Sequence, residues 1–364
     1  MFETGFPLEK MNYGTYYDKV AKKEYIYMGV VETDKKRICF FDATGKKEFE
    51  IPLHVELAHL LWIEGVFVYQ PDTVIVIDRY VKEPKIAYFN REGNYYSIIH
   101  IDSVYNTGTE RYRPIPCMQN IKSPHLYMHY FWNWENIKEE SDFQKEFPNK
   151  LEYVRAYMNK MHTVPQICMF DIQTQQLQVF PQNFSRLYFE TDTSLYVSAL
   201  LNVFFENDKL FISPHFNNKV LVYNPVVDKF IDTFRIISDY AKLLMPHYNI
   251  KEYWLNVYTS VDEYRIYGQL WNIIYDKNNH LYYAIVHHAM SEEDFWMEYT
   301  EERDFSIIIY DKNFNKLNEQ YFSKDEFDYR YIFLSSQGLF ISESGNSRDY
   351  DPTKCKFVVY EIEK

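Results

Sequence analysis

The stretch KIAYFNREGNYYSIIHI, residues 85–101, holds the pattern that decides the fold. An apolar run stops at Asn90, and a second apolar run begins at Tyr95, two residues past Gly93. Asn side chains bond to the backbone two residues further on, and glycine supplies the positive φ of a bulged hairpin. The stretch therefore predicts two antiparallel strands that are joined by a tight turn.

The same hairpin recurs along the chain. RICFFDATGKKEFEI, residues 37–51, repeats it with Asp42 and Gly45 in the places of Asn90 and Gly93. The polar residue of the turn stands at positions 42, 90, 171, 224, 311 and 361, and three of the five intervals are close to a period of about 50 residues. The two longer intervals indicate insertions. The remaining copies are QICMFDIQTQQLQVF (166–180), KVLVYNPVVDKFIDTF (219–234), FSIIIYDKNFNKLNEQYF (305–322) and KCKFVVYEIEK (354–364).

A second strand–turn–strand pattern precedes each hairpin, so that each repeat holds four strands. A period of roughly 40–50 residues with four strands is typical of a propeller blade. The sequence predicts one domain over residues 1–364, an all-β, six-bladed β-propeller with four-stranded antiparallel blades. A β-sandwich, whose strands are also regularly spaced, is the alternative. The second pattern spans residues 66–78, 117–131, 202–213, 272–285 and 331–342, with a weaker turn at Ser123–Pro124.

The composition fits a large β-rich core and excludes some partners. Of the 364 residues, 46% are hydrophobic and 19% are aromatic, and aromatic rings pack well on pleated sheets. The net charge of −13 opposes contact with phosphates, which excludes nucleic acid as a partner and disfavours anionic membranes. No apolar run approaches the ~20 residues of a transmembrane segment. The four cysteines lack metal-ligand spacing and are predicted to be buried apolar residues.

The long connections are predicted to fall on one face of the propeller. Turns within the hairpins are short, whereas the insertions belong to connections of the other kind. Long loops that are grouped on a rigid scaffold are where function usually lies. Helical spacing of apolar residues in PNKLEYVRAYMNKMH (148–162) predicts a helix that caps the propeller or binds a partner. The insertions are residues 132–165, 237–268 and 288–304, with shorter connections at 101–116 and 344–353.

The repeated motifs also carry a family resemblance. They are the F-D-x-x-G turn at Asp42, the F-N-x-x-G turn at Asn90, and the L-[FY]-[IYM] strands that begin at Leu126, Leu210, Leu281 and Leu339. With them the sequence resembles six-bladed propellers of the TolB-like and NHL-like kind. It looks like a domain-of-unknown-function family of Bacteroidetes propeller lipoproteins. The resemblance implies an exported, lipid-anchored protein of the cell envelope, in the periplasm or at the outer-membrane surface. The start MFETGFPLEK lacks a signal-peptide pattern, so a cytoplasmic location is the alternative.

Polar residues at the strand ends predict a site at the mouth of the central channel. First strands should begin, and second strands should end, near the axis on the elaborated face. His with carboxylate suits transition metals, Asn with carboxylate suits Ca²⁺, and a ring of such residues with Trp also suits a sugar. Most of these His residues have a structural reading too, as hydrogen-bonded core residues. The candidate ligand-binding residues are Asp78, Arg79, His129, Trp132, Asn202, His215, Asn272, His287, His288 and Glu343.

No motif of catalysis or phosphate binding is present, and three functions remain. The first is a non-enzymatic, envelope-associated, monomeric propeller that binds a protein, peptide or glycan at the elaborated face, because Tyr and Trp dominate binding hot spots. The second resembles the lactonase-like hydrolases, which hold one divalent ion, Ca²⁺ or another metal, with Glu and Asn; Asn202 and Asn272 match in type. The third is a structural scaffold in an envelope complex.

The last repeat ends after its third strand, which predicts how the ring closes. An unpaired edge there is a template for aggregation. We therefore expect the N-terminal segment, residues 2–8, to pair with residues 357–361 and complete the blade.

Overall fold

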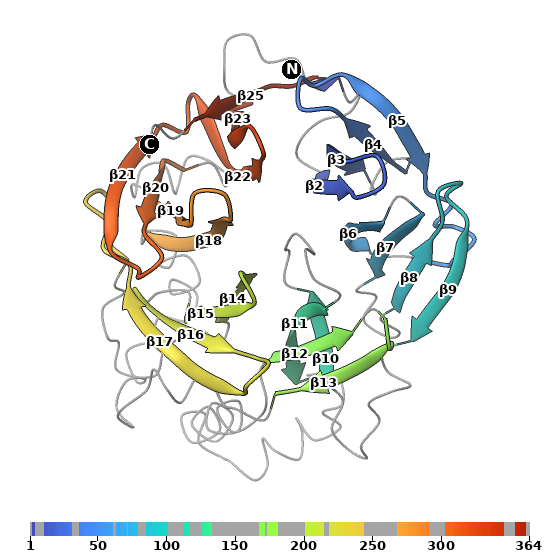
Figure 1. Ribbon diagram of the computed structural model, residues 1–364, viewed down its shortest axis with the longest axis horizontal. Helices are drawn as coiled ribbons and strands as arrows, with labels where there is room; N and C mark the ends of the chain where they lie inside the picture. Colours follow the sequence, from blue (N-terminus) through green and yellow to red (C-terminus); the bar gives the residue numbers. More distant parts are fainter. Residues whose placement is uncertain are drawn as a thin grey trace, which may run out of the picture.

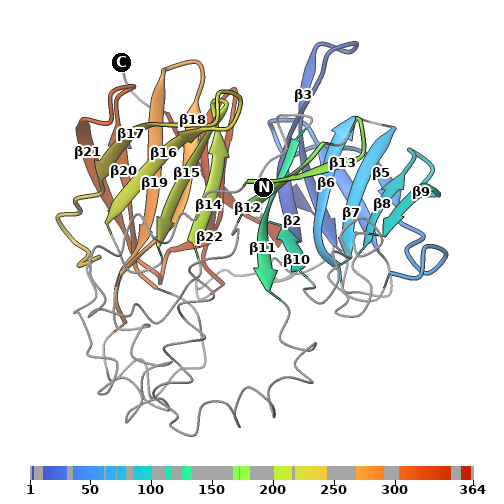
Figure 2. The same ribbon diagram turned by 90° about the horizontal axis from the view of Figure 1, so that it is seen from below.

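A computed structural model shows a ring of antiparallel sheets around a central axis (Figure 1). The strands run between two faces of this ring (Figure 2). Among the described residues, no helix is long and apolar enough to cross a membrane. The structure describes residues 2–3, 11–30, 36–60, 63–70, 72–78, 85–100, 112–116, 125–132, 167–171, 173–180, 201–214, 218–243, 268–290, 303–345 and 354–361.

Five sheets have four strands each, hydrogen-bonded in the order in which they follow along the chain. In the sheets other than the third, the first strand lies toward the channel and the fourth lies outermost (Figure 1). The first sheet holds β2 (Met11–Asp18), β3 (Lys23–Val30), β4 (Arg37–Phe41) and β5 (Lys47–Pro52). The second holds β6 (Ile63–Gln70), β7 (Thr73–Asp78), β8 (Lys85–Phe89) and β9 (Tyr95–His100). The third holds β10 (Tyr112–Pro116), β11 (His125–Trp132), β12 (Ile167–Asp171) and β13 (Gln176–Val179). The fourth holds β14 (Leu201–Glu206), β15 (Lys209–Pro214), β16 (Lys219–Asn224) and β17 (Lys229–Arg235). The fifth holds β18 (Gln269–Asp276), β19 (Leu281–His287), β20 (Phe305–Tyr310) and β21 (Lys316–Phe322).

The sixth sheet is smaller than predicted. It has three strands, β22 (Phe327–Ser335), β23 (Gly338–Glu343) and β25 (Phe357–Tyr360). The all-β propeller with antiparallel four-stranded blades is confirmed. The expected count of six such blades is corrected, because within the described residues five sheets have four strands and the sixth has no fourth strand beside β25.

The N-terminus closes the ring in a register that differs from the prediction. β1 (Phe2–Glu3) pairs with β24 (Lys354–Cys355), and this two-stranded pair is separate from β25. The Phe2 ring is buried, with its centroid 5.3 Å from that of Phe41 and 5.4 Å from that of Phe357. Residues 2–3 therefore do not pair with residues 357–361 as expected, and residues 4–8 lie outside the described residues. Phe2 instead links the first and last sheets through ring packing and a short pair beside the blade.

The third sheet begins earlier than predicted. Its first strand is β10 at residues 112–116, within a segment that was expected to be a connection, and Ile115 pairs with His129 of β11. Pro114 and Pro116 lie in β10. Proline is tolerated in an edge strand, which has one side without ladder partners, and β10 is such an edge. The prolines therefore concealed a strand, and the predicted first strand in the 117–131 hairpin is corrected.

The hairpin turns form as the sequence predicts. Asp42 Oδ1 accepts the N–H groups of Thr44 at 2.9 Å and Lys46 at 3.0 Å. Asn90 Oδ1 accepts equivalent bonds from Glu92 and Asn94. The φ angle is 87° at Gly45 and 81° at Gly93, so the glycines supply the left-handed conformation that the turns require.

One turn has a phenylalanine in the glycine position. Phe314 follows Asp311 by three residues, as Gly45 follows Asp42, and its φ is 62°. This conformation is unfavourable for a bulky side chain. The Phe314 ring stacks on Phe234 of the fourth sheet, with centroids 4.4 Å apart and planes 4° apart. Packing between the fourth and fifth sheets therefore holds a backbone that the residue type disfavours.

The consecutive apolar runs are buried because each sheet is covered by its neighbours. All five residues of β8 are buried. Ile75 and Tyr88 of the second sheet pack in one cluster with Cys168 and Phe170 of the third. Cys39, Cys168 and Cys355 are buried, as predicted; Cys117 lies outside the described residues.

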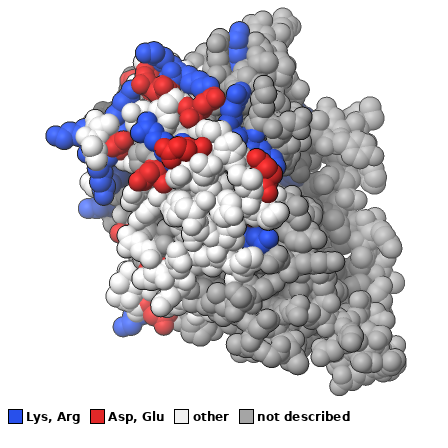
Figure 3. All heavy atoms as spheres, turned by 90° about the vertical axis from the view of Figure 1, so that its right-hand side faces the viewer, with Lys and Arg blue, Asp and Glu red and all other residues white. Residues whose placement is uncertain are grey.

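The outer edge of the first sheet carries alternating charges. On β5, Glu48 pairs with Lys23 at 3.2 Å, and Glu50 pairs with Lys47 and with Arg37. Figure 3 shows such basic and acidic side chains interleaved in the upper part of this side of the ring. Charges on an outermost strand discourage pairing with another chain.

Candidate functional site

The sheets bring three predicted residues to one face of the ring. Each first strand pairs antiparallel with the second, so first strands begin at the face where second strands end. Ile63 is opposite Asp78, Gln269 is opposite His287, and Phe327 is opposite Glu343. In Figure 2, the second strands of the third and fourth sheets, β11 and β15, point to the same side as each other. We call the face where Asp78, His287 and Glu343 end their strands the mouth face.

Two further predicted residues belong to the third sheet. Trp132 is the last residue of β11, opposite Tyr112, and lies at the mouth face. His129 lies three residues deeper, opposite Ile115 and Ile167. Arg79 and His215 lie outside the described residues, as do the predicted helix and most of the insertions.

Asn202 and Asn272 bond to the backbone. Asn202 Nδ2 donates to the Leu270 carbonyl oxygen at 2.7 Å and so joins β14 to β18. Asn272 Oδ1 accepts the N–H of Ile273 at 2.8 Å. Asn202 therefore links the inner strands of the fourth and fifth sheets, whereas the Asn272 bond stays within β18.

β18 bulges next to this brace. Leu270 pairs with Val286 and Asn272 pairs with Ile285, so Trp271 is the extra residue. A bulge bends its strand and redirects the side chain of the inserted residue. Trp271 is 37% exposed although it lies in an innermost strand.

The Trp271 ring is held by aromatic neighbours on its own and the next sheet. Its centroid lies 5.0 Å from that of Tyr329 in an edge-to-face contact at 85°, and 6.0 Å from that of His287. His287 meets Tyr329 at 83°, with centroids 5.3 Å apart. His287 and Tyr329 are 3% and 4% exposed, so the partially exposed indole rests on two buried rings.

β22 carries a larger irregularity at the same level. Asp328 pairs with Ser342 and Ile332 pairs with Ile341, which leaves three extra residues on β22. The first, Tyr329, packs on the fifth sheet. The third, Tyr331, packs on Tyr13 of the first sheet with centroids 5.6 Å apart.

Arg330 lies between these two tyrosines and is tied to Asp328. Its Nε donates to Asp328 Oδ1 at 2.9 Å and its Nη2 donates to Oδ2 at 2.7 Å. Burial alone would lower the pKa of Arg330, but the hydrogen bonds and charge of Asp328 outweigh it and raise the pKa. The Arg330 carbonyl accepts the Tyr13 hydroxyl at 2.6 Å.

A third inner strand is bulged near the mouth face. In β6, Ile63 pairs with Asp78 and Gly65 pairs with Ile77, so one residue is extra. The Val66 N–H donates to Asn12 Oδ1 of β2 at 3.2 Å. Bulges disrupt the ladder and leave backbone groups that need other partners. Beside each bulge, a side chain from the inner strand of a neighbouring sheet bonds such a backbone group. Asn12 bonds a group of β6, Asn202 bonds a group of β18, and Tyr13 bonds a group of β22.

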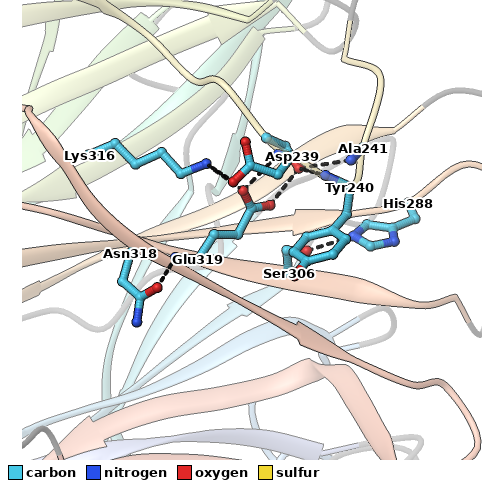
Figure 4. A network of polar contacts seen from close by, with 9 residues as sticks. Asp239, Tyr240, Ala241, His288, Ser306, Lys316, Asn318 and Glu319 are labelled. Atoms are coloured by element: carbon cyan, nitrogen blue, oxygen red, sulfur yellow. Dashed lines mark hydrogen bonds and ion pairs between the residues drawn. The ribbon is translucent and has the colours of Figure 1, made fainter.

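His288 lies apart from Trp271, in a network with the outermost strand of the fifth sheet (Figure 4). Its Nε2 is 2.7 Å from Ser306 Oγ, and its ring contacts Tyr321 and Tyr240. Burial lowers the pKa of His288, while the negative charges of Asp304 and Glu319 oppose this shift.

Glu319 connects this network to the segment between the fourth and fifth sheets. Ser238 Oγ donates to Glu319 Oε1 at 2.5 Å, the Asp239 N–H donates to Oε2 at 2.7 Å, and Lys316 Nζ lies 2.7 Å from Oε2. The Gly268 N–H donates to the Lys242 carbonyl at 3.1 Å. His288 therefore belongs to the anchoring of residues 236–243.

Carboxylates at the mouth face lie on different sheets. Glu343 Oε2 is 3.8 Å from Lys356 Nζ, and Asp78 is 1% exposed. Within the described residues, no three His, Cys, Asp or Glu side chains converge as a metal site would require. The rings of Trp271, His287 and Tyr329 and the Asp328–Arg330 ion pair instead form a surface between the fifth and sixth sheets, which we call the wall.

The sequence reasoning missed Trp271, Tyr329 and Arg330. The predicted residues lie at the ends of second strands and the starts of first strands, whereas these three side chains project from bulges in first strands. One signal was present: FDYRYIFLS, residues 327–335, is longer than its partner GLFISE, residues 338–343. Because Phe327 pairs with Glu343 and Ser335 pairs with Gly338, the surplus residues of the longer strand form a bulge.

This architecture defines the class of the protein as a β-propeller. The chain belongs to the DUF4221 family, a domain of unknown function, whose model matches residues 118–321. A crystal structure of a DUF4221 member from Bacteroides vulgatus is similar over 99% of this chain and 94% of that chain, with a TM-score of 0.70 and 14% identity. That likeness confirms the fold.

Other solved structures are less similar. A luciferin-regenerating enzyme has a TM-score of 0.43 and 10% identity, over 96% of this chain and 89% of that one. The extracellular domain of a putative one-component system from B. thetaiotaomicron has a TM-score of 0.39 and 8% identity, over 99% of this chain and 35% of that one. No curated protein matches the sequence.

Proposed function

We propose that the protein is a non-enzymatic, envelope-associated propeller that binds its ligand at the mouth face, between the fifth and sixth sheets. The observation that carries the proposal is the bulge in β18, which presents Trp271 on the inner side of the ring at 37% exposure. Large, rigid aromatic side chains supply contact area at low entropic cost and dominate binding hot spots.

The surroundings of Trp271 support binding over a role in folding alone. A single exposed aromatic residue is ordinary on a protein surface. Trp271 differs because its strand departs from regular pairing to present it, and because Tyr329 and His287 fix its ring. A preorganised ring loses little freedom when a ligand stacks on it.

The metal-dependent hydrolase finds less support. Asn202 and Asn272, the two residues that match the lactonase-like pattern in type, both bond to the backbone of inner strands. The envelope location rests on the family resemblance. Fractionation of cells that produce the full-length protein, with detection in membrane or soluble fractions, tests that part of the proposal.

The test of binding compares two exposed aromatic residues on innermost strands. Trp271→Ala removes the proposed platform. Tyr17→Ala truncates a 56% exposed ring near the end of β2 that lies away from the mouth face. Both variants and the parent are probed on arrays of peptides and of oligosaccharides. Loss of a bound probe in Trp271→Ala alone supports the proposal, and equal binding by all three proteins contradicts it.

A further inference from the structure

The channel-facing edges near the mouth face are poorly suited to an extended peptide. β6, β18 and β22 are edge strands of their sheets. A peptide that adds to a sheet edge needs a regular row of backbone donors and acceptors. Bulges interrupt that row in all three strands. The Val66 N–H and the carbonyls of Leu270 and Arg330 already bond to side chains of neighbouring strands.

The wall offers a ring and a neutral ion pair instead. The indole of Trp271 has a π face that carries partial negative charge, and the C–H groups on one face of a sugar ring complement it. Arg330 follows Tyr329, which contacts the indole, and its side chain is 23% exposed. The Asp328 side chain is only 8% exposed, so a sugar hydroxyl would reach the pair through the guanidinium of Arg330.

Charge decides between neutral and acidic sugars. Asp328 binds Arg330 through two parallel hydrogen bonds, which neutralises the guanidinium. The protein carries a net charge of −13, which repels anionic ligands at long range. An acidic sugar would therefore meet neither an unpaired positive charge on this pair nor a favourable overall field.

We infer that the ligand is a neutral oligosaccharide, one ring of which stacks on Trp271 while its hydroxyl groups reach the Asp328–Arg330 pair. The inference rests on the proposed function and narrows its ligand to one chemical class.

The experiment uses the whole chain and an array of neutral glucans, xylans and mannans beside uronate-containing oligosaccharides and peptides. A neutral oligosaccharide that binds is then titrated by calorimetry into the parent and four variants. We expect Trp271→Ala to weaken binding about tenfold or more, Trp271→Phe to weaken it less, and Tyr17→Ala to leave it unchanged. Circular dichroism confirms that each variant is folded.

The fourth variant tests the charge argument. Asp328→Asn keeps the size of the side chain and removes the charge that neutralises Arg330. We expect it to increase binding of uronate-containing oligosaccharides relative to neutral ones. If Asp328→Asn does not fold, the parent protein still decides, because preference for acidic over neutral sugars on the array overturns the inference.

The outcomes separate the inference from the function on which it rests. Trp271-dependent binding of peptides with no bound glycan overturns the glycan inference and leaves the proposed site in place. Glycan binding that Trp271→Ala does not weaken overturns both. An array on which no neutral oligosaccharide binds the parent also overturns the glycan inference.

Discussion

In both the hairpin turns and the bulged inner strands, side chains bond backbone groups that the sheet ladders leave without a partner. The two regions differ in how far apart the bonded residues lie in the sequence. In the turns, Asp42 and Asn90 bond backbone groups two and four residues further along the chain. At the bulges, the bonded residues are 54, 68 and 317 positions apart. Backbone groups need partners in both places. In the turns the partner is a residue nearby in the sequence, whereas at the mouth face it is a residue of another sheet.

The largest effect is expected where the most distant parts of the chain meet. Phe2→Ala removes a ring that packs between Phe41 and Phe357 and leaves a cavity between the first and last sheets. We expect the free energy of unfolding to fall by about 3–5 kcal/mol, as measured by urea denaturation. Tyr17→Ala, an exposed truncation on the first sheet, should change it by less than ~0.5 kcal/mol. Equal effects of the two variants would contradict closure through Phe2.

The second-largest effect on stability is expected at the side chains that bond beside the bulges. Asn202→Ala leaves the Leu270 carbonyl without its side-chain donor, which should lower the free energy of unfolding by about 1–3 kcal/mol. Because Asn202 bonds beside the bulge, the contribution of Trp271 to the emission, taken as the difference between proteins with and without Trp271→Phe, should also shift. Asn278→Ala alters an exposed turn residue and is the matched control, with an expected change of less than ~0.5 kcal/mol. Unaltered stability and emission in Asn202→Ala would show that the bond from Asn202 to Leu270 neither stabilises the fold nor positions Trp271.

The turns should respond locally and modestly. Asp42→Ala removes the acceptor of two backbone N–H groups, and we expect a loss of about 1 kcal/mol. Asp42→Asn keeps an acceptor oxygen in the same place, so its stability near pH 7 should stay close to that of the parent. If Asn is as damaging as Ala, the charge of Asp42 matters more than its geometry.

The same turn predicts a pH dependence with a definite sign. The hydrogen bond from Thr44 lowers the pKa of Asp42 in the folded protein. The unfolded state therefore binds its proton first, and the stabilisation is present above the ordinary value of about 4 and is lost as the pH falls through the folded pKa. Denaturation of the parent and of Asp42→Asn at pH 6 and pH 3 measures it, since the parent should lose more.

This contrast explains how much of the molecule its sequence predicts. The hairpins were predictable because Asp42, Gly45 and their equivalents act within a few residues. The sequence also predicted that second strands end at one face, where Asp78 and Glu343 lie. In the third sheet, Pro114 and Pro116 concealed an edge strand that only its pairing with β11 identifies.

The candidate site was less predictable, because it depends on register. Asn202 has the residue type of a ligand, but its partner is the backbone of another sheet. Trp271 reads as one more apolar residue in QLWNIIYD, and becomes distinctive only when Leu270 and Asn272 pair with consecutive residues of β19. Phe314 shows the same limit within a turn, where a ring contact with Phe234 overrides the preference for glycine.

The smallest expected effect concerns His288, which belongs to neither group of contacts. Burial lowers its pKa in the folded protein, against the opposing charges of Asp304 and Glu319. The unfolded state then binds more protons below about pH 6.5, so stability should fall as the pH drops through that range. His288→Gln should flatten the dependence between pH 7.5 and pH 5.5 relative to that of the parent protein. A parallel pH profile for His288→Gln and the parent would show that protonation at this position is not linked to folding, and that Ser306 and Tyr240 hold the ring in either charge state.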